Sequence, residues 1–303
     1  MEHPKNYIDL VSKFSTQGSC LEYLASVRWP EGFACSRCCE KQFWRSKRGL
    51  LVCSQCEYQT SILTGTLFQD TKLSLPVWFQ LIWWFMGQKS GASALSLQKN
   101  FGIGSYRTAW RLLQKLRLCM DQIGRPFLNG KVEVDEVFLG PINKKEVLII
   151  AAEIRGRATG RIRIRHLDSK ARAGIHKFIF ETIEPGSTIV SDRANSYVTI
   201  VEQGYAHDRK KKPYSWETVD GNDDRLLPRI GRVSTLLKRW KLGTYHGRTA
   251  KKNLHQYLDE FVFRYNRRTS GSRGLVFHRL LTAATLSAPR PSQVTGVKCI
   301  CRR

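Results

Sequence analysis

Two Cys-x-x-Cys pairs constrain the N-terminal part of this chain more strongly than any other feature. The first pair is Cys35 and Cys38, and the second is Cys53 and Cys56. Because each tight turn presents two sulfurs to one ion, two such pairs at this separation predict a four-thiolate, tetrahedral zinc site in a small β-ribbon. A redox pair is the alternative. Cys39 leaves the register open, since it could replace Cys38 as a ligand.

A short acidic strand is the second constraint. Residues 131–140 read KVEVDEVFLG, in which valines alternate with acids, and this period of two predicts a strand with one buried face. Asp135 lies in the middle of this segment, and a second apolar run, 188–190, ends beside Asp192. Two strand-borne carboxylates in a basic protein indicate a divalent-metal site for phosphoryl chemistry. An edge strand whose acids face water is the alternative.

The chain is strongly basic along its whole length. It has 50 lysines and arginines against 25 acids in 303 residues, which gives a formal net charge of +25 at pH 7. Charge of this size and spread predicts an extended track for nucleic acid rather than a single basic tail. The most apolar window, 77–86, is far shorter than the roughly 20 residues that a membrane span needs. Residues 1–10 lack the apolar core of a signal peptide, so we expect an intracellular protein.

The segment after the cysteine pairs has a helical pattern. Helices are expected over 75–89, 92–100 and 105–120, with a glycine turn at 101–104. A short helix, a turn and a basic helix predict a helix-turn-helix within residues 72–125, with an ordinary helical hairpin as the alternative. The last helix carries Arg107, Arg111, Lys115 and Arg117, and the first three of these are expected to bind DNA.

The pattern of residues 130–270 predicts a separate α/β domain. Strands are expected over 132–138, 147–154, 161–166 and 188–190. Helices are expected over 171–180, 194–202, 233–240 and 253–267, and a loop over 209–224. Three strands joined by short turns, then a helix, then the strand that ends at Asp192 is the order of an RNase H-like fold. The tail, 287–303, is expected to be disordered.

These parts together resemble a bacterial insertion-sequence transposase. The zinc ribbon over 18–65, the helical segment and the motifs VEVDE, SDRANSY, LLKRWKLGTYHG and HQYLDEFVFRYNRR are similar to those of the ISXO-like group, which is related to the eukaryotic Merlin elements. The resemblance implies a multidomain α/β protein whose DDE-type, RNase H-like domain uses two Mg²⁺ ions to cut DNA at element ends and join them to a target. Asp135 would bind both ions and Asp192 one, while Lys238, with Arg239 beside it, would contact DNA.

One position departs from the family pattern. Counting back from Lys238 by the family spacing places the third metal-side residue, usually Glu, Asn or His, at Gly231, which has no side chain to bind a metal. A neighbouring acid could substitute. Glu260 is one candidate, although it could equally be a structural partner of Arg264. The other candidates are Glu217, Asp220, Asp223 and Asp224.

Two functions remain open at this point. The first is an enzyme that binds the terminal inverted repeats of an element as a homodimer and cleaves and transfers DNA strands. The second is a decayed copy that binds the same DNA without catalysis. A zinc-ribbon transcription factor would leave Asp135 and Asp192 without a role. The resemblance further implies a bacterial cytoplasmic protein that associates with the nucleoid when it is bound to DNA.

Overall fold

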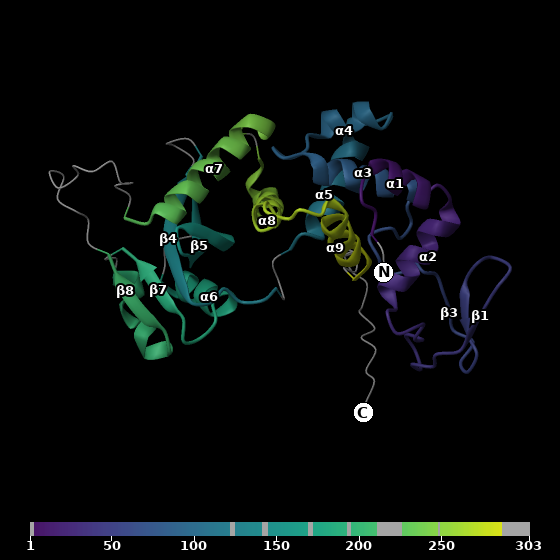
Figure 1. Ribbon diagram of the computed structural model, residues 1–303, viewed down its shortest axis with the longest axis horizontal. Coiled ribbons are helices and arrows are strands. Elements are labelled where there is room, and N and C mark those ends of the chain that lie inside the picture. Colours follow the sequence, from purple (N-terminus) through teal and green to yellow (C-terminus); the bar gives the residue numbers. More distant parts are fainter. Residues whose placement is uncertain are drawn as a thin grey trace. The chain divides into compact units, whose positions relative to one another are not determined.

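The computed structural model describes residues 3–121, 125–140, 145–168, 172–192, 195–210, 226–247 and 249–286 (Figure 1). The chain divides into two compact units. One consists of residues 121–269, and the other combines residues 1–120 with 270–303. The predicted tail and most of the predicted 209–224 loop lie outside the described residues. No helix in the described ranges combines the length and the hydropathy that crossing a membrane requires.

The first unit contains helices and a small antiparallel ribbon. Its helices are α1 (Tyr7–Lys13), α2 (Gln17–Arg28), α3 (Leu75–Gly87), α4 (Ala94–Asn100), α5 (Tyr106–Leu118) and α9 (Arg273–Leu286). The ribbon pairs its strands in the order β1 (Phe43–Arg45), β2 (Leu51–Cys53), β3 (Gln59–Thr60). Pro76 lies in the first turn of α3, where its missing N–H costs nothing. Trp78, Phe79 and Phe85 of α3 are fully buried, so this helix is the centre of the unit.

Helix α9 makes the first unit discontinuous in sequence. It follows residues 121–269 along the chain, yet it packs on α2 and α3. The amide of Leu67 donates a hydrogen bond to the carbonyl of Ala284 at 2.8 Å, and the Tyr23 hydroxyl lies 2.8 Å from Nδ1 of His278. Residues from both sides of the 121–269 insertion therefore share one core.

The second unit is built on a five-stranded mixed sheet. Its strands are β4 (Lys131–Leu139), β5 (Glu146–Arg155), β6 (Ala158–Leu167), β7 (Thr188–Ser191) and β8 (Ala206–Arg209). Their order is β6-β5-β4-β7-β8. Strands β4, β5 and β6 are antiparallel neighbours, whereas β7 and β8 run parallel to β4. This arrangement, with helices on both faces, is the predicted RNase H-like fold.

Helices cover both faces of this sheet. The helices of the unit are α6 (Arg172–Thr182), the 3₁₀ helices η2 (Asn195–Gln203) and η3 (Lys251–Asn253), α7 (Pro228–Tyr245) and α8 (Leu254–Tyr265). Apolar residues of α7 and α8 form one core with Ile150 and Val190, while residues of α6 and η2 form another with Val132, Val134 and Ile189. Alternation along β4 therefore sends Val132 and Val134 to the α6 face, and Glu133 and Asp135 to the α7 face.

The structure differs from the sequence-based elements in several places, and helices α1, α2 and α9 lie where no element was expected. The helix expected over 194–202 is the 3₁₀ helix η2, and α7 begins at Pro228, before the expected start at 233. Strand β8 was not expected, because its sequence, Ala-His-Asp-Arg, has no apolar alternation. It forms by parallel pairing with β7, from Thr188 with Ala206 to Ser191 with Arg209.

Candidate functional site

Asp135 and Asp192 are brought together by the pairing of β4 with β7. The parallel register joins Lys131 to Thr188 and Glu133 to Val190. Two further residues along both strands place Asp135 beside Asp192, on strands about 4.8 Å apart. Val190 belongs to the core under α7, so alternation sends the Asp192 side chain to the same face as that of Asp135. Both acids are half-buried, and together they present two carboxylates below α7.

Tyr197 of η2 closes the opposite face behind these acids. Its ring is fully buried, and its hydroxyl donates a 2.5 Å hydrogen bond to Oε1 of Glu136. Burial raises the pKa of Tyr197, and the charges of Glu136, Asp135 and Asp192 raise it further. Because three nearby negative charges disfavour its deprotonation, the hydroxyl stays protonated and acts as a hydrogen-bond donor. Glu136 is therefore held on the α6 face, away from the Asp135–Asp192 pair.

Glu133 fixes the start of α7 against the strand that carries Asp135. Its Oε2 accepts hydrogen bonds from the backbone N–H groups of Arg229 and Ile230, at 2.9 and 3.1 Å. Its Oε1 lies 3.0 Å from Nη1 of Arg229. A carboxylate at a helix N-terminus satisfies N–H groups that have no partner within the helix. This role could not be predicted from the sequence, because Glu133 and Asp135 occupy equivalent positions in the alternating pattern.

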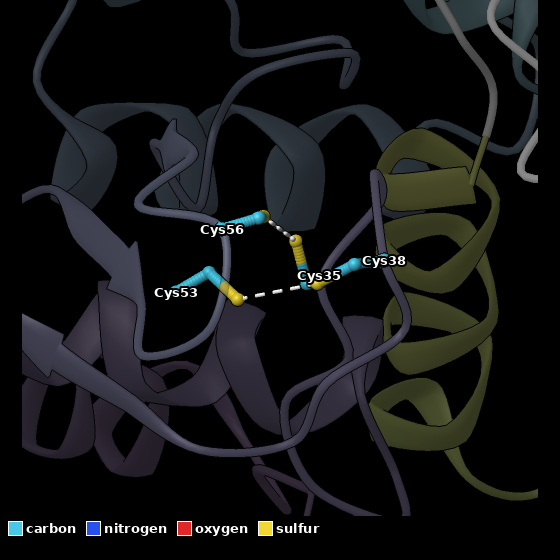
Figure 2. Close-up of side chains that lie close together, drawn as sticks. All are labelled: Cys35, Cys38, Cys53 and Cys56. Carbon is cyan, nitrogen blue, oxygen red and sulfur yellow. Dashed lines mark hydrogen bonds between the residues drawn. The ribbon is translucent and has the colours of Figure 1, made fainter.

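The four cysteines of the two pairs converge in the ribbon unit, and Figure 2 shows them approaching from two loops. Sγ of Cys35 lies 3.6 Å from Sγ of Cys56, and Sγ of Cys38 lies 3.4 Å from Sγ of Cys53. All four sulfurs lie within 4.8 Å of one another. A tetrahedral site with Zn–S bonds of about 2.3 Å places its sulfurs about 3.8 Å apart, so the donor set fits zinc.

The same turn occurs in both cysteine pairs and places Cys38, rather than Cys39, in the sulfur cluster. The amide of Cys39 donates to the carbonyl of Cys35 at 2.9 Å, and the amide of Glu57 donates to that of Cys53 at 3.1 Å. Cys39 and Glu57 both have positive φ, 62° and 54°. Cys39 therefore occupies the turn position that follows a pair, as Glu57 does.

Comparison with known proteins identifies one domain in each unit. Residues 127–266 match the ISXO2-like transposase domain, and residues 15–59 match the transposase zinc-ribbon domain. The chain belongs to the ISXO2-like transposase family. One relative, an uncharacterized protein in transposable element ISH50 of Halobacterium salinarum, is 26% identical over 133 residues. That match covers 43% of this chain and spans 44% of the relative's length.

Among solved structures, the transposase chain is similar to one from the simian T-cell lymphotropic virus intasome in complex with the PP2A regulatory subunit B56 gamma. The TM-score is 0.34 with 13% sequence identity, and the similarity covers 65% of this chain and 72% of the other. The family assignment rests on the two domain matches and not on this structure.

Gly231, which the family spacing predicts as the third metal-side position, lies in the second turn of α7. Its amide donates to the carbonyl of Leu227 at 3.0 Å, and its own carbonyl accepts from the Thr235 hydroxyl at 2.9 Å. Gly231, Thr235 and Lys238 are spaced by four and three residues, so they lie along one stripe of the helix. Thr235 and Lys238 are exposed, as is Arg239.

Glu260 is the candidate for the third metal ligand that lies within the described residues. It is fully buried on α8 and bonded to other residues. Its Oε1 lies 2.9 Å from Nε of Arg264, and its Oε2 accepts from the Tyr245 hydroxyl at 3.3 Å. In the described part of the chain, only the four cysteines form a group of three or more His, Cys, Asp or Glu side chains close enough for one ion. The other candidates, at 217, 220, 223 and 224, lie outside the described residues.

The predicted recognition helix α5 divides into an exposed and a buried side. Arg107 and Arg111 are exposed and Lys115 is half-buried, at positions four residues apart on one face. Arg117, on the same helix, is buried to 1% exposure, and its Nη2 donates to the carbonyl of Ala92 at 3.3 Å. It faces the core of the unit, where it bonds to the segment that leads into α4.

Proposed function

We propose that this protein is a metal-dependent transposase that binds DNA at the ends of its element and cleaves it at the Asp135–Asp192 pair. The adjacency of these two carboxylates, on neighbouring parallel strands and on the face covered by α7, is the observation that carries this proposal. Two strand-borne carboxylates suit Mg²⁺, which takes oxygen ligands and is commonly held by one or two carboxylates.

Asp135 and Asp192 would hold the two magnesium ions expected for this chemistry. Bound Mg²⁺ stabilises the negative charge that develops on the attacking and leaving oxygens of a phosphodiester. The residues of the chain position the DNA. Lys238 and Arg239 lie exposed on α7, whose start Glu133 fixes to β4, so the two cations can contact backbone phosphates beside the acids. Because two element ends must be held together, we expect a homodimer in the DNA complex.

The first unit would supply DNA recognition. Arg107, Arg111 and Lys115 form a basic face on α5, as expected for a helix that enters the major groove. The ribbon adds a second basic surface, on which Trp44 is exposed beside Arg45. Binding driven by such cations should weaken with salt, with a slope of about −0.9 in log–log form per phosphate neutralised. A slope near zero would contradict a phosphate-dominated interface.

The decisive experiment combines the purified chain with a supercoiled plasmid that carries the DNA flanking its coding region. We expect Mg²⁺- or Mn²⁺-dependent nicking that Asp135→Asn and Asp192→Asn each abolish without loss of DNA binding. Glu181→Gln is the matched control, since Glu181 is an exposed acid of α6 paired with Arg165. Arg107→Ala and Arg111→Ala should reduce discrimination between end DNA and random DNA, whereas Lys238→Ala should weaken both alike.

Gly231 favours a second candidate, a DNA-binding protein without catalysis. With glycine at this position, α7 presents no side chain to help hold an ion beside Asp135. Such a protein would shift end DNA in a binding assay and would leave it intact at every metal concentration. Nicking that depends on Asp135 would exclude this second function.

A further inference from the structure

A chain of hydrogen bonds reaches Asp192 from the face of the sheet opposite to the one that carries its carboxylate. Nε of Arg209 donates to Nδ1 of His207 at 3.3 Å. Nε2 of His207 lies 2.8 Å from Oγ of Ser191, and this hydroxyl donates to the backbone carbonyl of Asp192 at 2.9 Å. Ile189, the register partner of His207, belongs to the core under α6. His207 and Ser191 therefore lie behind the proposed metal site rather than in it.

The direction of every bond in this chain is determined by chemistry. A guanidinium has no acceptor, so Nδ1 of His207 must accept from Arg209 and carries no proton. The proton of the neutral imidazole is then on Nε2 and is donated to Ser191, whose own proton is already given to Asp192. Burial lowers the pKa of His207, and the charge of Arg209 lowers it further, which keeps the ring in this neutral form.

This series of hydrogen bonds ends at the residues where β7 ends, Ser191 and Asp192. Ser191 is fully buried, so its hydroxyl has no solvent to bond in place of His207 and Asp192. The amide of Lys210, at the end of β8, donates to the carbonyl of Ser191 at 2.9 Å. The peptide groups on both sides of the Asp192 Cα are thus held, the one before it by the amide of Lys210 and the one after it by a serine that β8 orients. Fixing this peptide fixes the direction in which the Asp192 side chain leaves the backbone.

We infer that His207, oriented by Arg209, is a positioning residue that holds Asp192 in its metal-binding direction through Ser191. This inference rests on the proposed function, because it assigns His207 a role at the same pair of acids. Residues that orient a metal ligand commonly contribute 10- to 100-fold to metal affinity. Strand β8 would then be a part of the site, although none of its side chains touches the metal.

The test measures Mn²⁺ binding to the full-length chain by electron paramagnetic resonance, with Asp135→Asn defining the signal that belongs to the acid pair. His207→Leu removes both ring bonds, and we expect about tenfold weaker binding. His207→Gln keeps an N–H near the position of Nε2 and should retain most of the affinity. The Mn²⁺ concentration that gives half-maximal nicking should shift in the same order. A purely structural defect would lower the amount of active protein without moving that concentration.

The outcomes separate the inference from the function on which it rests. Wild-type protein with no Asp135-dependent Mn²⁺ binding overturns the proposed function, and the inference fails with it. Wild-type protein that binds, together with His207→Leu that binds equally well, overturns the inference alone. If His207→Leu does not fold, ¹⁵N shifts of the wild-type imidazole, assigned by comparison with His207→Gln, decide the question. A proton on Nδ1 would contradict the hydrogen-bond directions given above. Arg209→Gln should allow the ring to adopt both tautomers.

Discussion

Glu133 of β4 and Arg229 of α7 form a buried ion pair in which the Glu133 side chain is 2% exposed and the Arg229 side chain 20%. The same carboxylate also binds two backbone amides of α7, so one side chain joins the helix to the strand that carries Asp135. The relative placement of Lys238 and Asp135 therefore depends on an acid outside the proposed metal site.

Glu133→Gln should destabilise the unit formed by residues 121–269. An amide can still accept from the helix N–H groups, but the charge-assisted bond to Arg229 is lost, and hydrogen bonds to charged groups contribute about 1.5–3 kcal/mol. We expect a loss of this size in the free energy of unfolding measured by urea denaturation. Arg232→Gln, at an exposed position of the same helix, should change it little. Equal stability of Glu133→Gln and the wild type would show that the pair does not anchor α7.

Substitution of Gly231 should separate helix stability from metal binding. Gly231 has no positive φ and lies within the hydrogen-bonded turns of α7. Gly231→Ala should therefore raise the free energy of unfolding by about 0.5–1 kcal/mol, because alanine loses less backbone entropy in a helix. Gly231→Glu and Gly231→His should in addition raise metal-dependent nicking, since each adds a ligand beside Asp135.

Gly231→Ala is the control for this gain, because it changes the helix without adding a ligand. Asp135→Asn in the Gly231→Glu background should abolish the added activity. Nicking by Gly231→Glu that does not exceed nicking by Gly231→Ala would exclude Gly231 as the third metal-side position. A vigorous wild-type enzyme that loses activity in Glu260→Gln, at unchanged melting temperature, would identify Glu260 instead.

Removal of zinc should unfold the ribbon before it affects the five-stranded sheet. Structural zinc sites supply folding free energy to small modules that have little core of their own. We expect one zinc ion per chain by elemental analysis, and loss of that ion in Cys53→Ser. Cys39→Ser tests the register, since Cys39 lies next to Cys38 but outside the sulfur cluster. Zinc that is lost in Cys39→Ser and retained in Cys38→Ser would show that Cys39, and not Cys38, is the ligand.

Acid should weaken the second unit through Glu153. This residue of β5 is buried, and burial raises its pKa. The hydrogen bonds and charge of Arg161, together with a hydrogen bond from the backbone amide of Asn129, outweigh burial and lower the pKa overall. A carboxyl whose folded pKa is depressed contributes stability above its unfolded pKa, and loses it as pH falls through the folded value. The free energy of unfolding should therefore decline below about pH 4.5, the ordinary value for glutamate. Glu153→Gln should be less stable at neutral pH and show a flatter pH dependence.

A substitution at Gly274 tests whether α9 packs with the N-terminal segment in one unit. A Cβ added at Gly274 would lie 1.9 Å from the carbonyl oxygen of Pro4, which is backbone and has little room to move. Gly274→Ala should speed hydrogen exchange in α2, α3 and α9 and leave β4 to β7 unchanged. Gly271→Ala is the control, because its Cβ would meet nothing within 4 Å. Equal exchange in the two variants would exclude this packing.

Sequence patterns predicted those parts of the fold that depend on residues close together in the sequence. The cysteine spacing predicted the sulfur cluster, and alternation in 131–140 predicted β4, because both signals are complete within a few residues. The burial of Arg117 could not be predicted, since a basic residue on a basic helix gives no sign that its guanidinium bonds to Ala92. The roles of Glu133, Tyr197 and His207 depend on partners far along the chain, and a single sequence does not report such pairings.

The position of α9 also orders events during synthesis. Domains generally fold in turn as the chain leaves the ribosome. Here the unit that carries the ribbon and α5 shares its core with α9, which is translated only after all of residues 121–269. A nascent chain would thus complete the domain with the five-stranded sheet before the unit with the ribbon and α5 could close. A message broken between these segments would yield a protein with the acid pair but without a finished core around α2, α3 and α9.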